Sequence, residues 1–292
     1  MRKSGGFFFA IAAIAMAIVI WGNPITQLVA AFSPAAPTAT ASHLALSTAD
    51  LSVDLDRLMA HVQALAKPRA TQPQRETARR YIIEQLSANG IASEQQRYGL
   101  ATEKSAGVDS GVNIVADILG SDPTAGSIVL GAHYDTEIGS PGADDNGSAI
   151  AALLEAARIF SSQSATLQAK GALPAPRGLK LVFFDQEERQ IDGSGLLGSI
   201  AFTEKLDNLT GVKGAIVLDM IGYACHTQGC QAYPPRLPIV NLPETGNFLV
   251  VLGLQNHIDV LGAFTLSAQT TLPTVLSLPV PQPMLNLCPD LL

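Results

Sequence analysis

Apolar residues recur three and four positions apart in two stretches of the chain, residues 51–66 and residues 74–89. This spacing places them on one face of an α-helix. Gly90 directly follows the second stretch, and glycine is a common residue at a helix C-terminus. The pattern therefore predicts two helices ahead of the first strand.

Further along the chain, short apolar runs have the length and composition of β-strands. They are rich in Val, Ile, Leu and Phe and cover residues 113–118, 128–130, 179–184 and 215–218. An Ala-rich helical stretch, residues 148–160, lies between the second and third runs, and residues 161–178 have a loop-like composition. Strands that alternate with helices predict an α/β fold with a mixed, largely parallel central sheet flanked by helices.

Another apolar run precedes these elements. Residues 5–21 carry no charge, and Arg2 and Lys3 lie on their amino side only. This pattern predicts a signal peptide or a signal-anchor helix within residues 1–24, and hence export of the following domain out of the cytoplasm. The pattern leaves two outcomes open: a membrane anchor through residues 5–21, or cleavage and a periplasmic or secreted protein.

A linker and one domain are predicted after this segment. Residues 33–48 are rich in Pro, Ala, Ser and Thr, so we assign residues 25–50 to a linker and residues 51–292 to a single domain. The chain has 18 basic and 25 acidic residues, a net charge of −7. This balance argues against nucleic acid as a partner.

The cysteines fit an exported domain. Cys225 and Cys230 are close enough in the sequence to close a small disulfide loop, with Cys288 left over. The alternative is a zinc knuckle formed by this pair and His226, but no second ligand pair follows at zinc-finger spacing. We expect the disulfide.

Histidine and acidic residues follow the predicted strands, where ligands gather in such sheets. His133 has Asp135 two residues on, a spacing at which the carboxylate can accept a hydrogen bond from a metal-bound imidazole. Asp144 and Asp145 precede the Ala-rich helix and could cap it. One carboxylate can also offer an oxygen to each of two cations, which makes Asp145 a candidate bridge.

The last two strand-like runs also end in acidic residues. Glu187 and Glu188 are adjacent, so one can bind a metal while its neighbour acts as a general base. Asp219 ends an apolar run, where a metal would compensate its buried charge. Each residue has an ordinary explanation by itself, such as a loop histidine or a solvated acidic cluster. Their joint occurrence at strand ends predicts a metal site.

These motifs together resemble the M28 family of zinc peptidases, mostly co-catalytic aminopeptidases with two zinc ions. The segments that carry the resemblance are Gly131–Thr136, Gly142–Ser148, Asp185–Glu188 and Leu218–Met220. The resemblance runs from about residue 51 to the end of the chain. It implies a zinc-aminopeptidase-like fold of the phosphorylase/hydrolase-like architecture, and an activity that releases N-terminal residues from peptides.

The resemblance also implies roles for individual residues. His133 and Asp219 would hold one zinc, Glu188 would belong to the second, and Asp145 would bridge the two. Asp135 would support His133 during catalysis. In this family the peptide bond after the bridging aspartate is often cis. Glu187 would be the general base.

The sequence departs from the family at one ligand. The fifth family ligand is a histidine in a Ser-Asp-His type segment, and nothing after Asp219 matches it. His226 and His257, which follows a helix-like stretch at residues 247–254, are weak candidates. We expect a domain that is incomplete at its C-terminus and an impaired second zinc site. Two alternatives follow: a catalytically impaired fragment or binding module with the same fold, and a single-zinc enzyme related to glutaminyl cyclases.

Overall fold

The structure is a computed structural model that describes most of the chain. The described residues are 52–99, 110–171, 173–190, 193–231, 243–270, 272 and 274–280, together with the backbone of 16–20. The predicted linker, the domain boundary at residue 51 and Cys288 lie outside this part of the chain.

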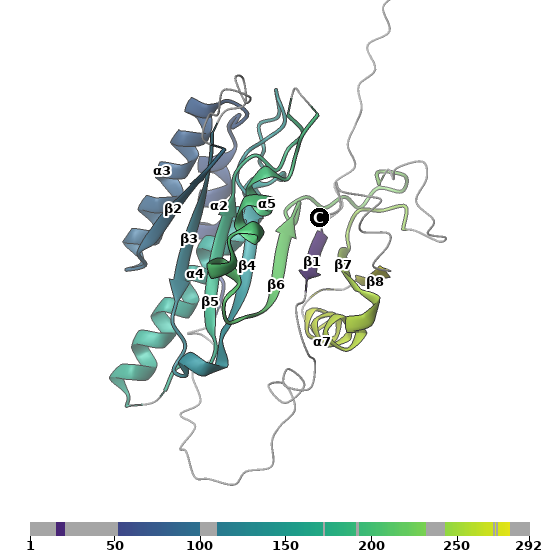
Figure 1. Cartoon of the computed structure of the whole chain (residues 1–292). Coiled ribbons are helices and arrows are strands. Elements are labelled where there is room, and N and C mark those ends of the chain that lie inside the picture. The colour runs from purple at the N-terminus through teal and green to yellow at the C-terminus, as the bar shows by residue number, and fades with distance from the viewer. Residues whose placement is uncertain are drawn as a thin grey trace, which may run out of the picture.

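A single mixed sheet forms the centre of the fold (Figure 1), with strand order β2-β3-β5-β4-β6-β1-β7-β8. The strands are β1 (Met16–Ile20), β2 (Ser93–Tyr98), β3 (Gly111–Ile118), β4 (Ser127–His133), β5 (Gly178–Phe184), β6 (Val212–Asp219), β7 (Leu249–Leu254) and β8 (Val275–Val280). β4 pairs in parallel with both β5 and β6. β3 is antiparallel to β2 and β5. The predicted fold class, a mixed and largely parallel sheet flanked by helices, is confirmed.

Helices cover both faces of this sheet. They are α2 (Leu55–Leu65), α3 (Gln72–Ala88), α4 (Gly147–Ala169), α5 (Leu197–Glu204), α6 (Leu206–Leu209) and α7 (Ile258–Ala268), with short 3-10 turns η3 (Pro123–Ala125) and η4 (Gln255–His257). The side chains of α3 and α4 pack with Ile114 and Leu181 of the sheet in the largest apolar core. On the opposite face Phe202 of α5 packs against Val115 and Val182. The central strands are therefore buried on both faces, as their continuous apolar sequence requires.

The order of the sheet explains where its functional ends lie. Because β4, β5 and β6 run in the same direction, their carboxyl ends meet at one edge of the sheet. Residue His133 lies opposite Phe184 in the register of β4 and β5. The acidic segment after Phe184 and the end of β6 at Asp219 are thus brought beside His133.

Two local predictions were wrong. Residues 161–169 continue α4 instead of forming a loop, and residues 249–254, predicted as helix-like, form strand β7. A short apolar run does not distinguish a buried strand from a buried helix by its periodicity. In the fold, residues 249–254 find a partner in β8, and α7 covers them through Leu261.

The apolar N-terminal segment also differs from its prediction where the structure describes it. Residues 16–20 form strand β1, which pairs antiparallel with β6 and parallel with β7. A run that contains Ile18, Val19 and Ile20 has high strand propensity, and pairing satisfies its backbone hydrogen bonds as well as a helix would. The remainder of residues 5–21 lies outside the described residues. Within the described part of the chain, no helix is both long enough and apolar enough to cross a membrane.

Candidate metal centre

His133 lies at the centre of the polar cluster at the strand ends. Its side chain is 4% exposed, and its Nε2 atom lies 3.1 Å from Asp145 Oδ1 and 3.5 Å from Asp219 Oδ1. Glu187 Oε2 lies 4.0 Å from the same nitrogen. Burial lowers the pKa of His133, but hydrogen bonds to the surrounding carboxylates outweigh it and raise the pKa well above its ordinary value. A cation is therefore favoured at this position.

The donor atoms of this cluster fit a metal ion. His133, Asp145 and Glu188 each offer one ligand atom, and these atoms lie within 4.8 Å of one another. Asp219 Oδ1 is buried and, although His133 Nε2 lies 3.5 Å away, has no hydrogen-bond partner among the described residues. A buried, unsatisfied carboxylate oxygen is costly, and a metal would satisfy it. One imidazole with several carboxylates suits zinc, although carboxylates also bind harder ions.

Asp135 ties His133 to the glutamate loop. Its Oδ1 lies 3.3 Å from His133 Nδ1 and accepts the backbone N–H of Glu187 at 3.0 Å. Its Oδ2 accepts the backbone N–H of Glu188 at 3.1 Å. Burial raises the pKa of Asp135, but the His133 contact and these amides lower it overall. The ionised carboxylate thus orients the other ring nitrogen, Nε2, toward the cluster, as a carboxylate behind a metal-bound histidine does.

The adjacent glutamates differ in their surroundings. Glu188 Oε1 accepts the backbone N–H of Glu137 at 3.1 Å, and Glu188 belongs to the metal-donor group. Glu187 is outside that group, and its carboxylate faces His133 from 4.0 Å. Burial, reinforced by the neighbouring carboxylates, raises the pKa of Glu187 to about 7 and that of Glu188 to about 8. Glu188 thus lies among the possible metal donors and Glu187 lies beside them, and both carboxyls can exchange protons near neutral pH.

Asp145 is held by its neighbour Asn146, a residue that the sequence reasoning missed. The Asp145–Asn146 peptide bond is cis, as the family resemblance implied. The buried Asn146 side chain donates to Leu218 O at 3.0 Å and accepts from Met220 N at 3.2 Å. It therefore fastens the loop of Asp145 to both sides of Asp219. Its place inside the Gly142–Ser148 motif was the available signal.

Asp144 does not act as the helix cap that its sequence position allowed. The N-cap of α4 is Asn146, without a side-chain capping bond. Asp144 Oδ1 instead accepts the backbone N–H groups of Gly222 and Tyr223 at 2.8 and 3.0 Å. Asp144 thus fixes the loop that follows Asp219.

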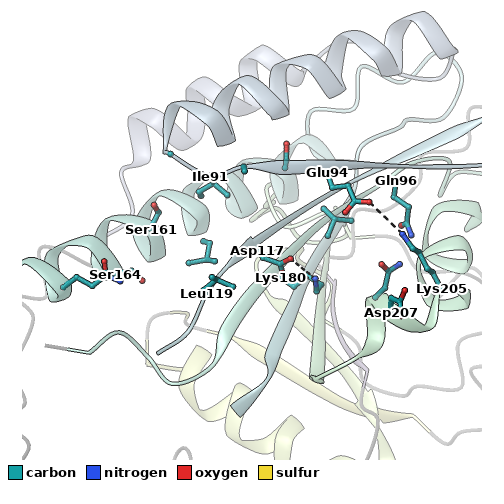
Figure 2. Close-up of a pocket in the computed structure, with 17 residues that line it drawn as sticks. Ile91, Glu94, Gln96, Asp117, Leu119, Ser161, Ser164, Lys180, Lys205 and Asp207 are labelled. Atoms are coloured by element: carbon teal, nitrogen blue, oxygen red, sulfur yellow. Dashed lines mark hydrogen bonds and ion pairs between the residues drawn. The ribbon is translucent and has the colours of Figure 1, made fainter. Parts of the chain in front are cut away.

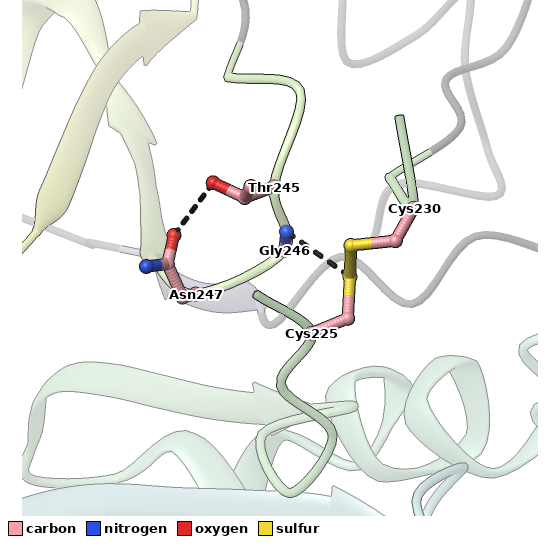
Figure 3. The surroundings of a disulfide bond; sticks show 5 residues. All are labelled: Cys225, Cys230, Thr245, Gly246 and Asn247. Carbon is pink, nitrogen blue, oxygen red and sulfur yellow. Dashed lines mark hydrogen bonds between the residues drawn. A yellow bond between two sulfur atoms is a disulfide. The ribbon is translucent and has the colours of Figure 1, made fainter. Parts of the chain in front are cut away.

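A disulfide closes the same loop. Cys225 and Cys230 are bonded with an S–S distance of 2.05 Å. Figure 3 shows the backbone N–H of Gly246 donating to Cys225 Sγ, at 3.2 Å. His226 lies between these cysteines and is exposed. Among the described residues, the metal-donor group includes neither His226 nor His257.

A separate groove lies away from this centre. Its volume is about 780 Å³. Figure 2 shows its lining residues on β2, β3 and the C-terminal half of α4. Its lysines are paired: Lys180 Nζ lies 2.8 Å from Asp117 and Lys205 Nζ lies 3.9 Å from Glu94. The strand-end histidine and carboxylates do not line it.

The fold and the cluster together define an α/β protein with a histidine and carboxylate centre at the carboxyl ends of its parallel strands. The sequence model of peptidase family M28 matches residues 113–238. The resemblance to this family is therefore confirmed over residues 113–238, a shorter stretch than the one expected from about residue 51 to the end, and the matched segment contains every side chain of the centre, from His133 to Asp219.

Curated relatives match about half of the chain. The uncharacterized protein YfbL of Escherichia coli K12 is 35% identical over 150 residues, which are 48% of this chain and 42% of YfbL. Leucine aminopeptidase 1 of Ajellomyces capsulatus is 33% identical over 152 residues, 49% of this chain and 36% of that protein. The chain thus spans less than half the length of these relatives.

Two solved structures share the fold. A leucine aminopeptidase precursor from Bacteroides thetaiotaomicron has a TM-score of 0.54 at 18% identity, over 79% of this chain and 78% of that one. A Porphyromonas gingivalis glutaminyl cyclase has a TM-score of 0.51 at 20% identity, over 82% and 80%. At these identities the likeness concerns the architecture alone.

Proposed function

We propose that this protein is a zinc-dependent exopeptidase that releases N-terminal residues from peptides, with Glu187 as general base. One observation carries the proposal. Glu188 lies in the metal-donor group with His133 and Asp145, whereas the adjacent Glu187 stays outside the group and faces the same His133 nitrogen. The similarity to peptidase family M28 and to leucine aminopeptidases supports peptide bonds as the substrate class.

The proposed zinc ligands are the three members of the donor group, His133, Asp145 and Glu188. Asp219 lies outside that group and is added because its buried Oδ1 lies 3.5 Å from His133 Nε2. Asp145 would offer one oxygen to each of two ions, and Asp135 would hold the imidazole of His133 in place. When bound, zinc supplies Lewis acidity, which lowers the pKa of water and polarises a carbonyl group. The donor group of His133, Asp145 and Glu188 could hold one metal ion. The binding of a second ion, with Asp145 between the two, is part of this proposal.

Glu187 would perform the proton transfers. A carboxylate with a pKa of about 7 can take a proton from the attacking water and return it to the amine that leaves. Its 28% exposed side chain leaves it accessible to water and to a substrate. The same carboxylate can make both transfers, so Glu187 can serve first as the base and then as the acid.

Replacement of Glu187 by Gln tests the role directly. With zinc in excess, we expect the wild type to hydrolyse leucine p-nitroanilide only slowly, because the second zinc site is expected to be impaired, and the Glu187→Gln variant to be about 10²–10⁴-fold slower still. Zinc binding should persist in the variant, because Glu187 is not a proposed ligand. Full activity in the variant would remove Glu187 from this role. Loss of zinc from the variant would make it a ligand.

A second candidate is a single-metal enzyme that cyclises N-terminal glutamine. The observation that favours it is that the described residues offer a single compact donor group, His133, Asp145 and Glu188, together with the shared fold of a glutaminyl cyclase. Zinc content separates the candidates, because two ions per chain favour the peptidase. Cyclisation of a Gln-Ala dipeptide with no hydrolysis of leucine p-nitroanilide would favour the cyclase.

We also propose that the domain is exported. The Cys225–Cys230 disulfide fits an oxidising compartment, and Arg2 and Lys3 ahead of the uncharged residues 5–21 point the same way. Because residues 16–20 pair with β6 and β7, the proposal concerns the compartment of the domain and not a membrane helix in that segment. Protease added to cells with a permeabilised outer envelope should digest the domain. Protection until the inner membrane is broken would contradict export.

A further inference from the structure

A buried arginine from outside the family-matched segment contacts two loops of the candidate metal centre. Arg69 is in the loop between α2 and α3 and is 2% exposed. The match to the family covers residues 113–238, so it gives no role to this residue. In the described part of the chain no carboxylate lies within ion-pair distance of its guanidinium. A buried charge without an ion-pair partner is expensive and needs an explanation.

The guanidinium is satisfied entirely by backbone carbonyls. Nε donates to Tyr134 O at 2.7 Å, and Nη2 donates to Gly142 O at 3.0 Å. Nη1 donates to Lys67 O at 3.0 Å and also to Leu65 O. These contacts use both edges of the planar group at once, which a lysine ammonium does not reproduce.

The two distant carbonyls belong to the loops that carry the proposed ligands. Tyr134 lies between His133 and Asp135, and Gly142 lies three residues before Asp145. Thr136 adds a further link, because its Oγ1 accepts the backbone N–H of Arg69 at 2.9 Å. Arg69 therefore connects the loop of His133 to the loop of Asp145.

The packing at this junction leaves little room for adjustment. Gly142 has φ +61°, and a Cβ atom there would lie 2.6 Å from Arg69 Nη2 and 2.3 Å from Thr136 Cγ2. The Gly142 carbonyl also accepts the backbone N–H of Gly147 at 3.0 Å, which closes the turn that contains Asp145. A shift of the guanidinium would consequently move this turn.

The charge of Arg69 acts on the same cluster. Burial lowers its pKa to about 10, while Asp135, Asp145 and Glu188 act in the opposite direction. The group thus stays protonated at neutral pH. Its field favours ionised carboxylates among the proposed ligands, which is the form that binds metal.

We propose that Arg69 is a positioning residue of the metal centre, which sets the spacing between His133 and Asp145 by holding Tyr134 O and Gly142 O on one guanidinium. The segment that joins α2 to α3 is then a working part of the site. This inference rests on the proposed metal-binding function.

Cobalt(II) binding tests the inference without relying on catalysis. The visible absorption of bound Co²⁺ reports ligand geometry, and titration gives its affinity. Arg69→Lys keeps the positive charge but loses the planar guanidinium that donates from two edges, and Arg69→Met loses both the charge and the guanidinium. Arg80→Met, at an exposed site on α3, is the matched control for charge. We expect both Arg69 variants to bind Co²⁺ about 10–100-fold more weakly and with an altered spectrum, and the control to match the wild type.

The outcomes separate the two proposals. If the wild type binds no Co²⁺ and no Zn²⁺, the metal centre itself is wrong, and this inference falls with it. If the wild type binds Co²⁺ and a folded Arg69 variant binds it with the same affinity and spectrum, only the role of Arg69 is wrong. Failure of both Arg69 variants to fold, judged by circular dichroism, would also overturn it, because Arg69 would then serve the stability of the fold.

Discussion

Asp135 Oδ1 lies 3.3 Å from His133 Nδ1, while the opposite ring nitrogen of His133 faces Asp145 and Asp219. One carboxylate thus fixes the direction in which the imidazole can present a lone pair. The same Asp135 oxygen accepts the backbone N–H of Glu187, so the relationship also sets the distance between the histidine strand and the glutamate loop.

Asp135→Asn should weaken zinc binding by about 10–100-fold, because the neutral amide no longer favours the required state of His133. The side chain keeps its size, so the fold should persist. Competition with a chromophoric chelator measures the affinity. An unchanged affinity would show that Asp135 does not support the ligand.

Asn146→Ala should lower the free energy of unfolding by about 1–3 kcal/mol, because Leu218 O and Met220 N lose their buried partner. Urea denaturation of metal-free protein measures it. Asn256→Ala, at an exposed position in η4, is the control and should change stability by less than about 0.5 kcal/mol. Equal effects in the two variants would contradict the proposed stabilising role of the Asn146 hydrogen bonds.

The raised pKa values of Glu187 and Glu188 predict a pH dependence. Both carboxyls have folded-state pKa values, about 7 and about 8, above their ordinary value of 4.5. The folded metal-free protein therefore binds protons more tightly than the unfolded chain, and its stability should fall as the pH rises from about 4.5 through 8. Urea denaturation with a chelator at pH 5 and pH 8 measures the fall.

Glu188→Gln supplies the control for that pH series. The variant cannot ionise at position 188, so its metal-free stability should decline less between pH 5 and pH 8 than that of the wild type. Identical declines would mean that Glu188 does not titrate in this range.

Removal of the disulfide should weaken the loop after Asp219. Cys225 and Cys230 close a short loop, and a chain-entropy model gives about 2 kcal/mol for a loop of this size. The Cys225→Ser, Cys230→Ser double variant should lose this amount in urea denaturation. Wild type in a reducing buffer should behave like the variant, and stability equal to the oxidised wild type would contradict the prediction.

Much of this fold was predictable because local patterns agree with it. The apolar runs at residues 113–118 and 179–184 lie within β3 and β5, whose burial on both faces demands such continuous runs. Residues 249–254 were not predictable by the same reasoning, because their strand state depends on pairing with β8 and on cover by α7. Residues 16–20 pair with β6 across about 200 positions of sequence, a contact that no local pattern contains.

Some residues of the candidate centre were predictable from the sequence and others were not. His133, Asp145, Glu188 and Asp219 stand at strand ends, and the sequence marks such ends by the change from apolar to acidic residues. Asn146 and Arg69 act through backbone groups of other loops, and their contacts exist only in the folded chain. Their residue types alone did not distinguish them from ordinary loop residues.

The zinc content of the purified, dialysed protein tests the central claim, that these strand-end side chains form a metal centre. Wild type, His133→Ala and a matched control, Glu137→Ala in the same loop, are compared by elemental analysis at equal protein concentration. We expect zinc to be retained by the wild type and by the Glu137→Ala control, and to be largely lost from His133→Ala. Equal zinc in all three proteins, or none in the wild type after exposure to zinc, would contradict the account.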